Sequence, residues 1–133
     1  MAKYLTIIGP IASGKGTQAS VISRKYGLAH LSPGAIFRDA IASGTEVGLK
    51  VRNIVESGYL VPDSMVNDVV RDVFGTHDFA RGFILDGYPR TLNQAVALDG
   101  MLSRLRARLD AVIRLDMDDE EVVGRISGRY YCV

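Results

Sequence analysis

The segment Gly9-Pro10-Ile11-Ala12-Ser13-Gly14-Lys15-Gly16-Thr17 decides how this chain folds. It follows an apolar run over residues 4–8 and leads into a helical pattern, which predicts a strand, a phosphate-binding loop and a helix in succession. Glycines in such a loop let backbone N–H groups surround phosphate oxygens, at which the helix N-terminus also points. We expect Lys15 to reach the outer phosphates and a hydroxyl to help hold Mg²⁺.

The loop departs from the strict phosphate-binding pattern at one position. That pattern has Ser or Thr directly after the lysine, whereas here Gly16 follows Lys15 and Thr17 comes next. The alternative to phosphate binding is a tight turn with a solvated lysine. The strand before the loop and the helix after it favour phosphate binding.

Composition predicts one soluble domain of 133 residues, of which 47% are hydrophobic and 23% are charged. The net charge of +1 argues against a general surface for nucleic acid or anionic membranes. No apolar segment is long enough to span a bilayer, the N-terminus lacks a secretory pattern, and the single cysteine excludes an internal disulfide. We therefore expect a cytoplasmic protein.

Strand and helix patterns alternate along the chain. We expect a helix over 15–25 and a strand over 28–31, then helices over 35–43 and 45–57 and one beginning at Asp63 or Ser64. A strand over 82–86 precedes a helix from about 91 to 109 with Leu105 and Leu109 on its buried side, a strand over 110–115 and a helix from about 118 to 128. This order predicts an α/β fold with a central parallel sheet and helices on both faces.

One carboxylate stands where such sheets bind ligands. Asp86 ends the buried strand 82–86, and the carboxyl end of a parallel strand is the usual place for a ligand-binding residue. We interpret Asp86 as a carboxylate that acts on Mg²⁺ directly or through water, in preference to a helix cap or a surface turn.

Other polar residues have two interpretations each. His30 suits a structural strand end better than a catalytic base, and Arg38 alone suits a solvated helix face. Gln94 stands three residues after Thr91, the spacing of a capping box, which competes with a role in ligand binding. Arg125 and Arg129 lie one helical turn apart, so they form either a phosphate clamp or a solvated pair.

Five segments, taken in order, resemble the adenylate kinase family of nucleoside monophosphate kinases over the whole chain. The Gly-Lys-Gly-Thr sequence of the loop and the Asp-Gly-Tyr-Pro-Arg sequence are the most specific. The segments are residues 9–18, 32–38, 58–63, 85–91 with Gln94, and 125–129.

The resemblance implies reversible transfer of a phosphoryl group from MgATP to AMP, giving two ADP, by a P-loop three-layer sandwich. It implies ATP binding by the loop (Gly9, Ala12, Ser13, Gly14, Lys15, Gly16, Thr17) with Arg125 and Arg129. It implies AMP binding by Ser32, Pro33, Arg38, Leu60, Val61, Gly87, Arg90 and Gln94, with residues 32–61 as a mobile segment that closes over AMP. Catalysis would then rest on Lys15, Arg90, Arg125 and Arg129, and Asp86 would hold Mg²⁺ through water.

Two family positions differ in the AMP segment. Where the family usually has Ser-Thr-Gly-Asp, this chain has Ser32-Pro33-Gly34-Ala35. Pro33 lacks the hydroxyl that contacts the base, which leaves UMP or CMP open as alternative acceptors. Ala35 lacks a carboxylate, so that metal binding would depend more on Asp86. Ile11-Ala12 replaces the usual Pro-Gly within the loop.

The resemblance also implies a C-terminally shortened member of the family, in which residues 129–133 begin a lid and four of five strands are present. We expect lower stability and turnover, or a nucleotide-binding fragment without catalysis. Family members are usually monomers, whereas an open fourth strand favours self-association. Structural zinc is expected only in a longer form that contains the lid, because Cys132 alone cannot form a four-ligand site.

Overall fold

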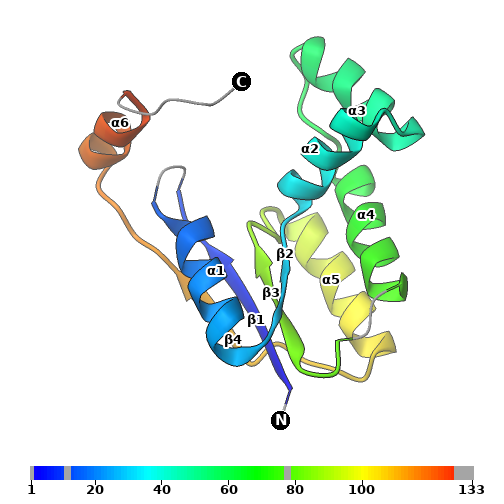
Figure 1. Ribbon diagram of the computed structural model, residues 1–133, viewed down its shortest axis with the longest axis vertical. Helices are drawn as coiled ribbons and strands as arrows, with labels where there is room; N and C mark the ends of the chain where they lie inside the picture. Colours follow the sequence, from blue (N-terminus) through cyan, green and yellow to red (C-terminus); the bar gives the residue numbers. More distant parts are fainter. Residues whose placement is uncertain (1, 11–12, 77–78, 128–133) are drawn as a thin grey trace.

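The protein folds around one four-stranded sheet, seen in the computed structural model, which describes residues 2–10, 13–76 and 79–127 (Figure 1). The strand order is β2-β3-β1-β4, and each pair of neighbours is parallel. The predicted α/β class is therefore confirmed. The strands are β1 (Lys3–Ile8), β2 (Ala29–Leu31), β3 (Gly82–Asp86) and β4 (Ala111–Arg114).

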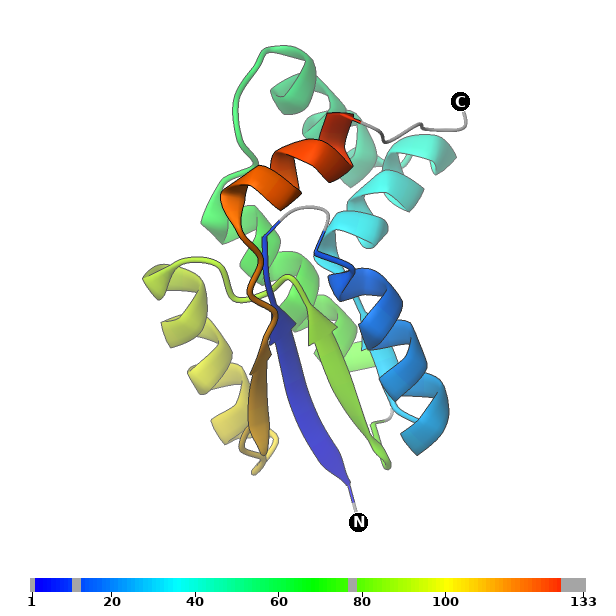
Figure 2. The same cartoon turned by 90° about the vertical axis from the view of Figure 1, so that its left-hand side faces the viewer.

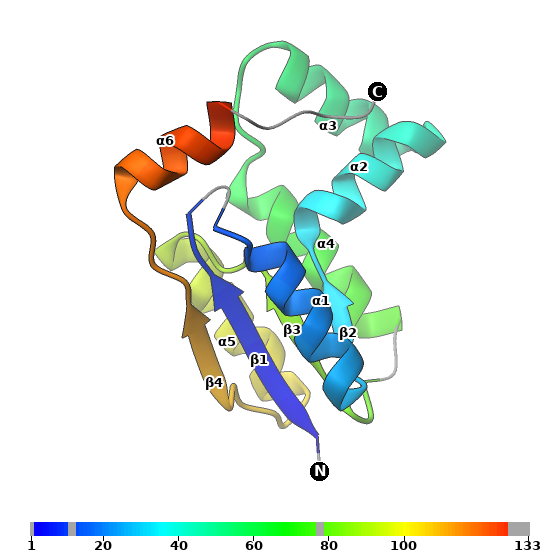
Figure 3. The same ribbon diagram turned by 60° about the vertical axis from the view of Figure 1, so that its left-hand side comes forward.

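Helices cover both faces of the sheet, as predicted. The helix α1 lies on one face and α4 with α5 on the other, as Figures 2 and 3 show from two sides. The helices α2 and α3 form a pair beyond the carboxyl end of β2, and α6 follows β4 beyond the same end of the sheet. Their bounds are α1 (Lys15–Tyr26), α2 (Pro33–Ser43), α3 (Glu46–Glu56), α4 (Asp63–Thr76), α5 (Leu92–Arg104) and α6 (Asp119–Ser127).

The central strand β3 divides the core in two. Phe83 and Leu85 face α4 and α5, where the larger cluster includes Phe74 and Leu98, whereas Ile84 faces α1 in a second cluster. All five residues of β3 are buried. A strand covered on both faces needs a continuous apolar run, which explains why this segment could be recognised from the sequence.

Two helix boundaries differ from the prediction by more than one residue. The helix α2 begins at Pro33 rather than near residue 35, because Ser32 Oγ accepts from Ala35 N at 3.3 Å and proline suits the first helical position.

The prediction that α5 runs to about Leu109 is wrong, since the helix ends at Arg104 and Arg106 has a positive φ of 54°. Leu105 is 45% exposed rather than buried, and Leu109 packs against the core from the loop. The loop brings Asp110 to Tyr4, whose N–H donates to the Asp110 carboxylate at 2.7 Å. This contact starts β4, which lies at an edge of the sheet with Val112 57% exposed.

The helices α2 and α3 cross at a glycine. Gly48 of α3 is buried, and a Cβ atom there would overlap the Ala40 carbonyl of α2. The two backbones approach each other so closely that no side chain fits between them.

We expect Gly48→Ala to lower the free energy of unfolding by about 1–3 kcal/mol, the usual cost of overpacking. The gain in helix propensity, about 1 kcal/mol, is too small to offset that overlap. Gly100→Ala in α5 is the matched control, because a Cβ atom there meets nothing within 4 Å. Urea unfolding of both variants measures the difference, and equal changes in stability would contradict a tight crossing at Gly48.

Candidate phosphate-binding site

The described residues of the loop after β1 turn the chain toward α1. Gly14 has a φ of 84°, a conformation that favours glycine, and α1 begins at the next residue. Ser13 N donates to Pro10 O at 3.2 Å, which closes a turn. Within the described part of the chain, Ser13 Oγ is buried and has no hydrogen-bond partner. A buried hydroxyl without a partner is costly, so this group fits a ligand.

Asp86 lies beside this loop at the end of β3. Its side chain is 7% exposed; Oδ1 forms an ion pair with Lys15 Nζ, and Oδ2 lies 3.0 Å from His30 Nε2. Burial alone would raise the pKa of Asp86, but hydrogen bonds from Lys15 and His30 and their positive charge outweigh burial, so the pKa lies below its ordinary value. The carboxylate is therefore ionised at neutral pH.

His30 has a larger part in the site than its sequence position indicated. The strand β2 pairs with β3 in parallel register, His30 opposite Ile84 and Leu31 opposite Leu85, which carries the imidazole to the end of β3. This position supports the prediction that His30 has a structural role, since its imidazole holds the Asp86 carboxylate in place. The only signal in the sequence was the position of His30 at a strand end.

Arg90 approaches Lys15 across a glycine. Gly87 has a φ of 78°, and a Cβ atom there would lie 2.9 Å from Arg90 Nη2 and 3.4 Å from Lys15 Nζ. Arg90 Nε donates to Gly87 O at 2.8 Å. Two cations thus meet over one backbone position, at the carboxyl ends of β1 and β3, which is an arrangement suited to phosphate.

Hydrogen bonds from buried residues hold the turn that carries Arg90. Thr6 Oγ1 donates to the Tyr88 carbonyl at 2.6 Å, and the Tyr88 hydroxyl donates to Asn67 Oδ1 at 2.8 Å. Burial raises the pKa of Tyr88 to about 12, so that it remains a neutral donor. The position of Arg90 therefore depends on contacts with β1 and α4.

Gln94 makes half of the expected capping box. Thr91 Oγ1 accepts from Gln94 N at 3.1 Å, but Gln94 Oε1 accepts from Arg90 N at 2.7 Å instead of from Thr91 N. The side chain is buried, and its amide is engaged by the turn that carries Arg90. Gln94 therefore belongs to the same structural unit as Arg90.

The predicted AMP segment lies beyond the same end of the sheet as the loop, since β2 leads directly into α2 (Figure 1). Pro33 is buried, whereas Arg38 is exposed and folds back over the first turn of α2, where a Cβ atom on Gly34 would lie 3.4 Å from Arg38 Nη1. Leu60 is 92% exposed and Val61 is half-buried. Gly16 and Thr17 are exposed at the start of α1.

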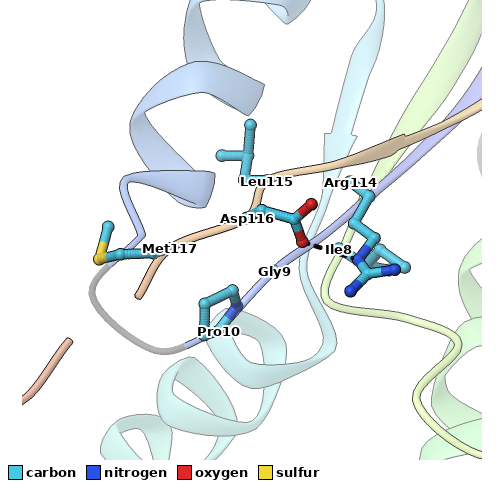
Figure 4. A pocket seen from close by; sticks show the side chains of 7 residues that line it. All are labelled: Ile8, Gly9, Pro10, Arg114, Leu115, Asp116 and Met117. Atoms are coloured by element: carbon cyan, nitrogen blue, oxygen red, sulfur yellow. Dashed lines mark ion pairs between the residues drawn. The ribbon is translucent and has the colours of Figure 1, made fainter. Parts of the chain in front are cut away.

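A pocket of about 360 Å³ flanks the loop on the β4 side (Figure 4). It is lined by residues 8–10 at the end of β1 and the start of the loop, including Gly9, and by residues 114–117 at and after the end of β4. Arg114 and Asp116 form an exposed ion pair there at 2.9 Å. Asp86 ends β3, which borders the opposite side of β1. No sequence motif marks this pocket, because it is formed by two strand ends that only the fold brings together.

Three of the predicted site residues cannot be related to Asp86 and Arg90 by contacts of the described residues. Arg125 belongs to α6, and Ala12 and Arg129 lie outside the described residues. Among residues 2–10, 13–76 and 79–127, no cluster of three or more His, Cys, Asp or Glu side chains could hold a metal ion. In the same residues, no helix is long and apolar enough to cross a membrane.

Comparison with known proteins identifies the family. Residues 7–129 match the family described as adenylate kinase. The chain belongs to the adenylate kinase family. It is 49% identical to an adenylate kinase from Kosmotoga olearia and 52% identical to one from Fervidobacterium nodosum, in each case over 96% of this chain. An adenylate kinase from Rhizobium meliloti is 48% identical over 94% of the chain.

The adenylate kinase relatives are longer than this chain. The alignments cover 60% of the Kosmotoga olearia protein, 59% of the Fervidobacterium nodosum protein and 65% of the Rhizobium meliloti protein. The residues matched to the adenylate kinase family include the loop over residues 9–17, Asp86 and Arg90.

The lowered pKa of Asp86 predicts a pH dependence of stability. The stabilisation that it contributes is fully present above the unfolded-state pKa of about 3.9 and is lost as the pH falls through the folded-state pKa. We therefore expect the free energy of unfolding of the wild type to fall more steeply below about pH 4 than that of Asp86→Asn. Parallel acid-unfolding slopes for the two proteins would contradict this assignment.

Proposed function

We propose that the chain carries out adenylate kinase chemistry, in which a phosphoryl group passes from MgATP to AMP. The observation that carries this proposal is the meeting of Lys15, Asp86 and Arg90 at the carboxyl ends of β1 and β3. Phosphoryl transfer requires positioning and charge stabilisation rather than a protein nucleophile, and these residues bring charged groups together at one place.

The donor would lie along the loop. The backbone amides of the loop, Lys15 and the free hydroxyl of Ser13 would hold the ATP phosphates, with Thr17 nearby. The pocket at the ends of β1 and β4 would take the nucleoside of the donor, since the acceptor segment lies toward β2. Arg125 and Arg129 are proposed to contact ATP and the transferring group.

The acceptor would lie between α2 and the turn after β3. Arg38 and Arg90 would hold the AMP phosphate, and Gln94 with the Val61 backbone would bind the adenine. Residues 32–61 would close over AMP and exclude water. Pro33 supplies no hydroxyl to the base, which keeps UMP and CMP as acceptors to compare with AMP.

Magnesium fits this site through water. Both Asp86 oxygens already have protein partners, and Mg²⁺ commonly keeps several waters and binds through one carboxylate and substrate phosphates. When bound, Mg²⁺ would neutralise negative charge on the phosphates. Asp86 would orient its waters, and Lys15 would move from Asp86 toward the phosphates.

ADP formation from ATP and AMP with Mg²⁺ tests the proposal, with UMP, CMP and GMP as alternative acceptors. We expect Lys15→Met to lower turnover about 10²- to 10³-fold, as for loss of a positioned charge in other active sites. Lys25→Met, at the opposite end of α1, is the matched control and should retain turnover. Equal turnover in the wild type and Lys15→Met would indicate a contaminating kinase and would contradict the proposal.

A further inference from the structure

The hydrogen-bond partners of the Gln94 side-chain amide permit only one orientation of that amide. Gln94 Oε1 accepts from the backbone N–H of Arg90 at 2.7 Å, and Gln94 Nε2 donates to Asp63 Oδ1 at 2.9 Å. A backbone N–H only donates and a carboxylate only accepts, so a rotated amide would place donor against donor and acceptor against acceptor. The two contacts therefore fix which end of the amide is oxygen and which is nitrogen.

Asp63 is itself held by a second contact. Thr91 Oγ1 donates to Asp63 Oδ2 at 2.8 Å while accepting from Gln94 N at 3.1 Å. The three side chains thus form a closed network that joins the first residue of α4 to the first turn of α5. Gln94 is 5% exposed and its contact with half-buried Asp63 is partly buried, so water competes less for this contact than for the exposed contact between Thr91 and Asp63.

The network leaves part of the amide free. A glutamine amide has two N–H donors and an oxygen with two lone pairs. Within the described part of the chain, the contacts of the Gln94 amide use one N–H donor and one lone pair. One N–H of Nε2 and one lone pair of Oε1 are therefore not used by these two contacts.

We propose that Asp63 is a positioning residue that sets the base specificity of the acceptor site by locking the Gln94 amide. This inference rests on the proposed function, in which Gln94 binds the acceptor base. The free donor and acceptor match the N1 acceptor and N6 amino donor of adenine. Hypoxanthine has the same ring shape but presents N1–H and O6, the reverse pattern, which the locked amide opposes.

A purely structural role of Asp63 would have different consequences. Loss of a link between α4 and α5 would lower the stability of the protein and would weaken the binding of every nucleotide to a similar degree. Loss of orientation would instead let the amide rotate and change the ratio of affinities for AMP and IMP. This ratio therefore separates the two roles.

The experiment measures the dissociation constants of AMP and IMP for the full chain by isothermal titration calorimetry, which does not require turnover. We expect the wild type to bind AMP at least about tenfold more tightly than IMP, and Asp63→Ala to reduce this ratio about tenfold, the equivalent of one hydrogen bond. Asp63→Asn keeps an acceptor for Gln94 Nε2 and should restore most of the ratio.

Asp68→Ala is the matched control, because Asp68 lies on the same helix with an exposed ion pair to Arg71 at 2.9 Å. It should leave the ratio unchanged, and thermal unfolding verifies that each variant is folded. The inference is wrong, and the proposed function stands, if Asp63→Ala weakens the binding of AMP and IMP equally. The same conclusion follows if Asp63→Ala does not fold and Asp63→Asn no longer binds AMP more tightly than IMP. A wild type that binds neither nucleotide would overturn both.

Discussion

The site depends on a carboxylate kept ionised inside the protein. Removing Asp86 from water is costly, and the cost is offset only because Lys15 of α1 and His30 of β2 bind one oxygen each. These partners come from different elements, so the ends of β1, β2 and β3 must align for the carboxylate to be satisfied. The carboxylate can therefore stay ionised only if the strands keep this parallel register.

Much of the fold was predictable because its signals are local. The buried strand β3 is a continuous apolar run, and the loop before α1 has glycines where the backbone must turn. The end of α5 was not predictable, because the spacing of Leu105 and Leu109 continues a helical pattern. The helix stops where Asp110 must reach the backbone of Tyr4, a contact between segments distant in sequence.

The same distinction applies to the site. Lys15 and Asp86 belong to recognisable motifs, whereas the contact of His30 with Asp86 depends on the order of strands in the sheet. Asp63 resembled a helix-starting residue, and only the packing of α4 beside α5 joins it to Gln94. Residues that hold other residues in place are thus the ones that sequence motifs do not reveal.

The close crossing of α2 and α3 at Gly48 has a mechanical consequence. Because the two backbones are in close contact at this crossing, the helices cannot move closer together there and resist sliding past each other. The pair joins the rest of the chain near Ser32 and near Gly58, which has a φ of 83°. A rotation of the pair would carry Arg38 of α2 with it, whereas Leu60 lies beyond Gly58 and outside both helices.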